Sequence, residues 1–178
     1  DDRRQRQMCI RDRIDSEKMT SIIDKWNWGT GSEIDIYLDV ESRKNSITYR
    51  SNLSRLVDQL IIENNFIDAE RILDNCMQKL PIDKFGYYTL LEPFISSYYR
   101  LNKGEKARKI FDEIAAKYQE NLFYYSTFSN SAKNRYAEEI YTDIERYRSL
   151  VDVLINFEEE EFLDTRMKEF NDYLDLFL

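Results

Sequence analysis

The chain has 178 residues, 42% of them hydrophobic, which is enough for one ordinary domain with a single core, and its four glycines and two prolines argue against a turn-rich β-sandwich or a disordered chain. A formal net charge of −8 disfavours nucleic-acid or anionic-membrane binding. The absence of histidine excludes Ser-His-Asp and Cys-His catalysis and His-ligated zinc.

The first thirteen residues differ in character from the rest of the chain. They carry five arginines and no apolar segment typical of a signal peptide. Residues 3–13 are identical to one reading frame of the DNA adapter used in transposase-based sequencing libraries. We therefore interpret residues 1–13 as an adapter artefact rather than native sequence, the alternative being a basic nucleic-acid-binding arm. On this interpretation the native N-terminus is missing.

Two helices are predicted next, separated by a loop. A short one covers Asp15 to Trp26, with Asp15 or Ser16 as its cap. The loop, NWGTGSEIDIYLD, holds two of the four glycines and a short apolar piece. A long helix is then expected from about Val40 to Asn64. Its apolar positions follow the helical spacing i, i+3, i+4, i+7, i+8, at Leu53, Leu56, Val57, Leu60 and Ile61.

Two further segments show the same apolar spacing, 38 residues apart. The positions are Ala69, Ile72, Leu73, Cys76, Met77 and Leu80 in the first, and Ala107, Ile110, Phe111, Ile114, Ala115 and Tyr118 in the second. Each follows a turn and another amphipathic helix, so the pattern indicates a repeated helix–turn–helix unit. Pro81 lies twelve residues after the first alanine, as in a tetratricopeptide repeat, whereas the second unit has Gln119 there. We expect degenerate repeats.

The remaining segments complete an all-α fold. Pro93 either kinks a helix over Tyr87–Leu101 or lies in the first turn of a helix that begins near Glu92. The segment ENLFYYSTF continues the preceding helix or forms a short one, and SNSAKN is a polar break. Two last helices carry apolar stripes at Tyr136, Ile140, Ile144, Tyr147, Val151 and Leu154, and at Leu163, Met167, Phe170, Leu174 and Phe177. We predict one domain over residues 14–178, built of antiparallel helical hairpins.

No set of residues in the sequence matches a catalytic, cofactor or metal site. Acidic pairs such as Asp35 with Asp39, and the run Glu158–Glu161, fall on no apolar face that would desolvate a carboxyl group. Gly29 and Gly31 lack the residues that complete a phosphate-binding loop. Cys76 occupies an apolar helix position, where a buried structural thiol is expected. We therefore predict no catalytic residues, no cofactor and no metal, and a non-enzymatic chain.

The aromatic residues are the better candidates for function. Adjacent tyrosines recur along the helices, so that one ring of each pair can pack inward while its neighbour lies near the surface and contacts a peptide or glycan. Packing within the core is the alternative for these rings. Trp28 either covers the core or docks on another domain. The candidate docking or groove residues are Trp26, Trp28, Tyr37, Tyr88, Tyr99 and Tyr125.

Five segments together resemble a known family. In order they are DKWNWGTGSEIDIYLD, YRSNLSRLVDQLI, AERILDNCMQKLP, FGYYTLLEPFISSYYRLNKGEKA and AKYQENLFYYSTF. They are similar to the C-terminal region of a Bacteroidota multi-span membrane protein family of unknown function, related to the eukaryotic protein O-mannosyltransferase. The resemblance covers residues 14–130. Trp26 stands where the family usually has Phe, and Ser96-Ser97 where it has Glu-Ala.

The resemblance implies a chain that is one part of a larger protein. Its catalytic membrane domain, using a lipid-linked sugar, would precede this chain. The chain itself would be a non-catalytic, tetratricopeptide-like domain on the periplasmic face of the inner membrane. It would dock on the membrane domain or present an acceptor polypeptide, without nucleic acid and without inserting into the membrane. The alternative is a stand-alone adaptor that binds a peptide or protein partner.

Overall fold

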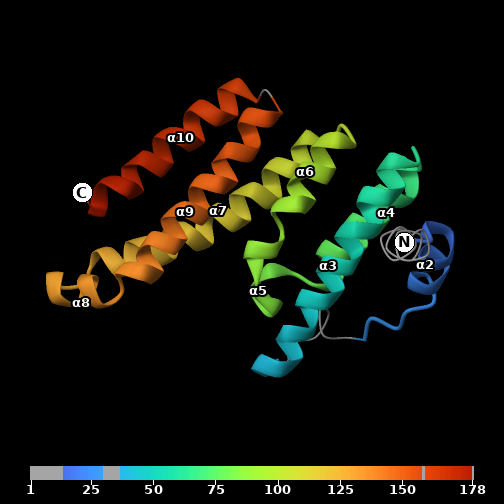
Figure 1. Ribbon diagram of the computed structural model, residues 1–178, viewed down its shortest axis with the longest axis horizontal. Helices are drawn as coiled ribbons and strands as arrows, with labels where there is room; N and C mark the ends of the chain where they lie inside the picture. The colour runs from blue at the N-terminus through green and yellow to red at the C-terminus, as the bar shows by residue number, and fades with distance from the viewer. Residues whose placement is uncertain (1–13, 30–36, 158, 178) are drawn as a thin grey trace, which may run out of the picture. The chain divides into compact units, whose positions relative to one another are not determined.

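The computed structural model describes residues 14–29, 37–157 and 159–177, and within them the chain forms nine α-helices, two 3₁₀ turns and no strand (Figure 1). This confirms the all-α prediction. The helices pack in antiparallel pairs within two compact units, one ending at Leu101 and the other beginning at Asn102. The artefact predicted for residues 1–13 lies outside the described residues, as does most of the apolar piece at 34–38.

The first unit is organised around one long helix. Helix α3 (Val40–Ile62) packs along α4 (Phe66–Lys79). Three further helices, α2 (Ser16–Ile23), α5 (Ile82–Phe85) and α6 (Glu92–Arg100), and the 3₁₀ turn η1 (Tyr88–Leu90), also contact α3. All five positions of the predicted α3 stripe are buried, and on α4 all but the half-buried Met77 are buried. The apolar spacing therefore identifies the core of this unit correctly.

Side-chain caps explain where α2 and α3 begin. The carboxylates of Asp15 and Asp39 accept hydrogen bonds from the backbone N–H groups of Lys18 (3.0 Å) and Ser42 (2.8 Å). Helix α2 ends at Ile23, three residues earlier than predicted, so Trp26 lies in the loop that follows. Proline lies in the first turn of α6, which settles the alternative left open for residues 87–101.

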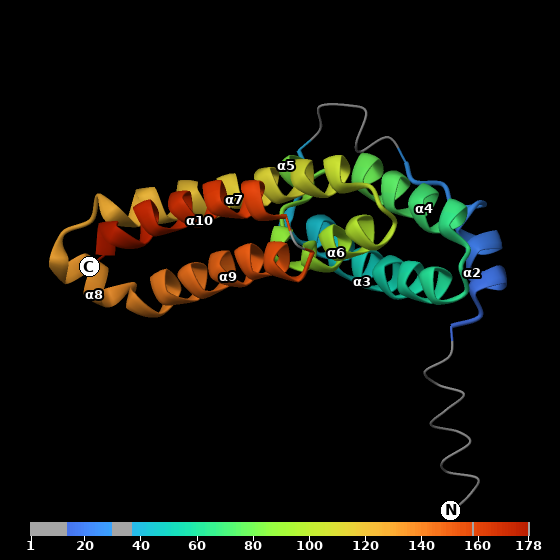
Figure 2. The same ribbon diagram turned by 90° about the horizontal axis from the view of Figure 1, so that it is seen from above.

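The second unit consists of α7 (Gly104–Ser126), α8 (Asn130–Arg135), α9 (Ala137–Asn156), α10 (Glu160–Leu174) and the 3₁₀ turn η2 (Asp175–Phe177). Helix α9 runs beside both α7 and α10 (Figure 2). All six predicted α7 positions are buried. The segment SNSAKN, predicted as a break, begins α8, because the Ser129 hydroxyl caps it through the N–H of Ala132.

Tyr147 of α9 is the centre of the second unit's core. Its ring stacks on Tyr118 (6.0 Å between centroids) and meets Phe170 edge-on (5.2 Å). Gln119 donates a 2.7 Å hydrogen bond from Nε2 to the Tyr147 hydroxyl oxygen. Burial raises the pKa of this phenol to about 12.

None of the described helices is long and apolar enough to cross a membrane.

Replacing Ala69 by Arg is expected to unfold the first unit. Ala69 is fully buried on α4, and a guanidinium there would be desolvated without a partner. We expect a loss of about 4 kcal/mol or more in the free energy of unfolding, measured by urea titration followed by circular dichroism. Gln78→Arg places the same side chain on the exposed face of the same helix and serves as the control. An unchanged unfolding midpoint for Ala69→Arg would contradict the packing of α4.

Candidate functional site

The two tryptophans of the chain meet on the surface of the first unit. Trp26 contacts Trp28 edge-on with 5.2 Å between ring centroids, and it contacts Tyr49 of α3 in the same way at 5.4 Å. Both indoles are half-buried, and Tyr49 is 45% exposed. The ring of Trp26 stands at 67° to that of Trp28 and at 71° to that of Tyr49, so the three rings pack edge to face and do not form one flat platform.

These rings border a hollow of about 490 Å³, here called the tryptophan hollow. Its walls come from the loop after α2, the first half of α3, the end of α4 and α5. The lining residues are Trp26, Asn27, Trp28, Ser42, Asn45, Ser46, Tyr49, Leu80 and Phe85. Aromatic and uncharged polar side chains thus line it together, which is the usual composition of a binding pocket.

Part of the polar lining is already committed to local structure. Ser42 donates from Oγ to Asp39 Oδ2 (3.0 Å), and Ser46 donates to the Arg43 carbonyl oxygen (2.7 Å). The Asn45 amide, the Tyr49 hydroxyl and the two indole N–H groups form no hydrogen bond to another described residue. These groups remain available as donors to a ligand.

Arg50 lies behind the wall of the tryptophan hollow, one helical turn after Ser46. It is fully buried, yet none of the carboxylates in the described part of the chain forms an ion pair with it. Its guanidinium donates to three carbonyl oxygens, those of Leu80 (2.7 Å), Gly86 (2.5 Å) and Tyr87 (3.2 Å). Arg50 thereby ties α3 to the ends of α4 and α5, which carry two lining residues of the hollow.

The charge of Arg50 is balanced by helix ends rather than by an acid. Leu80 caps the C-terminus of α4 and Gly86 that of α5, where the peptide dipoles place partial negative charge. Burial lowers the pKa of the guanidinium, which at neutral pH still remains protonated. Gly86 and Tyr87 both have positive φ, at 66° and 49°, and the Arg50 bonds hold this tight reversal of the chain.

The other predicted docking residues do not join this site. Tyr37 is 87% exposed, Tyr88 is half-buried and neither lines the tryptophan hollow. Tyr99 is half-buried with its hydroxyl oxygen inside the fold, beside a fully packed Tyr98. Tyr98 is held by its hydrogen bond to Asp74 Oδ1 at 2.8 Å. Tyr98 and Tyr99 thus differ in burial, whereas Tyr87 and Tyr88 are both half-buried.

Tyr125 belongs to an aromatic cluster in the second unit. It contacts Tyr124, Phe128 and Tyr136 at centroid distances of 5.9, 5.7 and 6.1 Å. Tyr124 is the more exposed member of its pair, at 62%. The cluster packs the junction of α7 with α8 and α9, so Tyr125 stabilises that junction.

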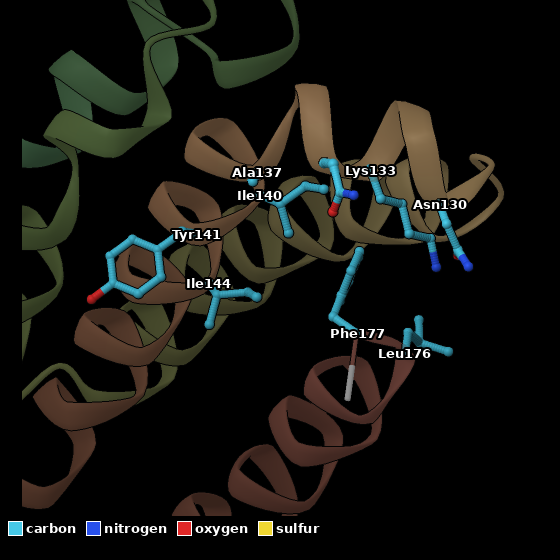
Figure 3. A pocket seen from close by; sticks show the side chains of 9 residues that line it. Asn130, Lys133, Ala137, Ile140, Tyr141, Ile144, Leu176 and Phe177 are labelled. Atoms are coloured by element: carbon cyan, nitrogen blue, oxygen red, sulfur yellow. The ribbon is translucent and has the colours of Figure 1, made fainter.

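A second hollow of about 490 Å³ lies between α8, the start of α9 and η2 (Figure 3). Leu176 and Phe177 face Asn130 and Lys133 there, whereas the ring of Tyr141 projects away from them (Figure 3). The ammonium of Lys133 lies over the ring of Phe177, 5.3 Å from its centroid. This hollow is more open to solvent than the tryptophan hollow. Its cationic residue, Lys133, already interacts with the ring of Phe177.

Two features that could carry chemistry are the thiol of Cys76 and clusters of metal-binding side chains. Cys76 is fully buried, and burial raises the pKa of its thiol to about 12, so the nucleophilic thiolate is suppressed at neutral pH. The described histidine, cysteine and acidic residues form no group that could hold a metal ion. Asp35 and Glu158, named above as acid candidates, lie outside the described residues.

The sequence predicted Trp26 and Trp28 but not Tyr49, Phe85 or Arg50. Tyr49 comes from another helix, and its contact with Trp26 is not visible in local spacing. Arg50 did leave a signal, because it falls three residues before Leu53 on the buried stripe of α3. A polar residue in that register predicts a buried hydrogen-bonding role.

We expect Arg50→Met to destabilise the first unit and to open the tryptophan hollow. The substitution leaves the Leu80 and Gly86 carbonyl groups without their donor, whereas the Tyr87 carbonyl keeps the N–H of Leu90, at a cost of about 3 kcal/mol in the free energy of unfolding. Urea titration gives this cost, and a red shift of tryptophan emission in the native state reports the hollow. Arg55→Met, on the exposed face of α3, should change stability by less than about 0.5 kcal/mol. Equal behaviour of the two variants would rule out a clamping role for Arg50.

Comparison with known proteins found no protein-family model, no curated protein and no solved structure that matches the chain.

Proposed function

We propose that this chain is a non-catalytic helical module that binds a protein partner through the tryptophan hollow. The observation that carries the proposal is the meeting of both tryptophans with Tyr49 around a surface hollow lined by free uncharged donors. Tryptophan and tyrosine supply most of the energy at protein contact sites, because they combine a large apolar face with a polar handle.

We also propose that the helices are degenerate tetratricopeptide-like repeats. The same six offsets recur on α4 and α7, 38 residues apart, and eleven of these twelve side chains are buried. Alanine leads both sets, and α4 ends two residues before Pro81. The pattern supports a shared ancestry of the two helices, with the terminal proline kept in one and lost in the other.

The family resemblance supplies the biological setting of the proposal. On this basis the chain is the water-exposed C-terminal region of a multi-span, glycosyltransferase-like membrane protein, on the periplasmic face of the inner membrane. Its partner is then its own membrane domain or the polypeptide that receives the sugar. Sugar transfer would belong to the membrane domain, and we assign no catalytic residue to this chain.

Sequencing the gene without interruption upstream of Ile14 tests this setting. We expect codons for several spans of about 20 apolar residues each, with an acidic residue in an early external loop. A start codon or a signal peptide directly upstream would instead favour the stand-alone adaptor. Sugar transfer or hydrolysis by the purified chain alone would overturn the non-catalytic assignment.

The contact surface is tested with the encoded upstream domain, purified in detergent. We expect Trp28→Ala to weaken binding of the chain by tenfold or more in calorimetry, since truncating a central aromatic residue costs about 2 kcal/mol. Tyr141→Ala removes an equally aromatic, 64% exposed side chain of the second unit and should leave the affinity unchanged. If the unchanged chain, Trp28→Ala and Tyr141→Ala bind the upstream domain with equal affinity, the contact lies elsewhere on the chain.

A further inference from the structure

We propose that a groove between α9 and α10 binds an amphipathic helix of a partner protein, with basic residues beside the apolar face of that helix. The groove belongs to the second unit and is separate from the tryptophan hollow. Three features of the described residues lead to the proposal: an apolar floor that faces solvent, walls that repeat at helical spacing, and a row of unpaired charges along one rim.

The groove has a volume of about 470 Å³ and a floor of apolar side chains. The floor consists of Ile144, Val151, Ile155, Met167, Phe170 and Leu174. Val151 and Phe170 are buried, three of the others are half-buried, and Ile155 is 52% exposed. Helix α7 packs on another face of the α9–α10 pair, and none of its residues lines the groove. An apolar strip between two helices is therefore open to water, and covering it is favourable.

The walls of the groove favour a helix over an extended segment. Lining residues recur on α9 at 144, 148, 151 and 155 and on α10 at 167, 170 and 174, so each wall repeats once per helical turn. An extended segment laid on this floor would lose water from its N–H and C=O groups, and the backbone groups of α9 and α10 are already bonded within their helices. A helix satisfies its own backbone, and its apolar side chains enter the groove between two others.

The described helices already pack in this way in both units. In the first unit, α6 contacts both members of the antiparallel α3–α4 pair. In the second unit, α7 contacts both α9 and α10. Each unit therefore contains a pair of helices that accepts a third helix, and the α9–α10 pair has a further apolar face that is still exposed at Ile155.

A row of charges on α9 selects the kind of helix. Glu145, Arg148 and Asp152 line the groove at spacings of three and four residues, so they project from one face of α9. All three side chains are exposed, and none forms a hydrogen bond or ion pair with another described residue. A partner helix with lysine, glutamate and lysine at the same spacing meets each charge with an opposite one. The net positive charge of such a helix also complements a chain of net charge −8.

Fluorescence anisotropy of labelled peptides, titrated with the full chain at low salt, tests the proposal. The matching peptide is an alanine-based helix of about 18 residues, with leucines along one face and lysine, glutamate and lysine beside them. A second peptide has the three flanking charges exchanged in sign, and a third has the composition of the first in an order without an apolar face. We expect saturable binding of the matching peptide. The affinity should be about threefold lower for the sign-exchanged peptide, since exposed ion pairs contribute little, and about tenfold lower or more for the third.

Reversing the charge of Arg148 separates recognition at the rim from general attraction. Arg148→Glu gives the rim three negative charges, so it should weaken binding of the matching peptide and strengthen binding of a peptide flanked by three lysines. Arg146→Glu makes the same change at an exposed arginine of α9 that does not line the groove. This control should leave the order of affinities among the peptides as it is in the unchanged chain.

Ile155 provides the test of the apolar floor. Ile155→Asn removes the most exposed apolar side chain of the groove and should weaken binding of the matching peptide about tenfold, because less apolar area is buried. Ile67→Asn makes the same change at an 84% exposed isoleucine of the first unit and should leave the affinity unchanged. Circular dichroism shows whether each variant keeps its helices.

Several outcomes would overturn the proposal. They are the absence of saturable binding, equal affinity for the matching peptide and the peptide without an apolar face, and an order of affinities that Arg148→Glu does not change. A dimer of the chain in sedimentation velocity that Ile155→Asn dissociates would also overturn it, because a second copy would then occupy the groove. The Trp28→Ala experiment concerns the first unit, so a failure here leaves the proposed function standing.

Discussion

The buried guanidinium of Arg50 is the interaction on which the first unit depends. Helix α4 cannot end in the common glycine cap, because Leu80 is followed by Pro81, which has no N–H group to offer the last carbonyls. Arg50 supplies the missing donor from the neighbouring helix, at 2.7 Å from the Leu80 carbonyl oxygen. The same group binds the carbonyl oxygens of Gly86 and Tyr87, so the ends of α4 and α5 both converge on one side chain of α3.

The charge of Arg50 is thus balanced by the dipoles of carbonyl groups at helix ends and not by a buried carboxylate. A buried carboxylate opposite Arg50 would itself have to be desolvated, and the attraction between the charges often fails to offset that cost. Carbonyl groups at helix ends already point inward and lack partners, so their desolvation is part of folding in any case. The second unit uses a milder solution in its core, where the neutral pair Gln119 and Tyr147 joins α7 to α9.

Helical spacing predicted most of the fold because burial of apolar side chains determined it. The stripes on α3, α4 and α7 are buried nearly to the last residue, and the cap of α2 is Asp15, one of the two residues that the sequence offered. Spacing failed where polar contacts decide the backbone. The cap by Ser129 turns a polar run into α8. The sequence left two alternatives for residues 87–101, and the left-handed Tyr87 and the proline in the first turn of α6 select the helix that begins at Glu92. The site was predicted in part, because Trp26 and Trp28 lie two residues apart in the sequence, whereas Tyr49 reaches Trp26 only through the tertiary fold.

A surface hollow bordered by aromatic rings would collapse unless its walls were held apart. The apolar faces of Trp26, Tyr49 and Phe85 would gain by closing on one another, since burial of apolar area is favourable. Two constraints oppose this closure: the cap of Asp39, which holds the start of α3, and the Arg50 bonds, which hold the ends of α4 and α5. Both are hydrogen bonds to backbone groups, so they position the walls through main chain rather than through flexible side chains. Because the walls are already held in place, a ligand that enters the hollow has to reorganise the chain little. The free-energy cost of binding is then smaller, and the affinity is higher.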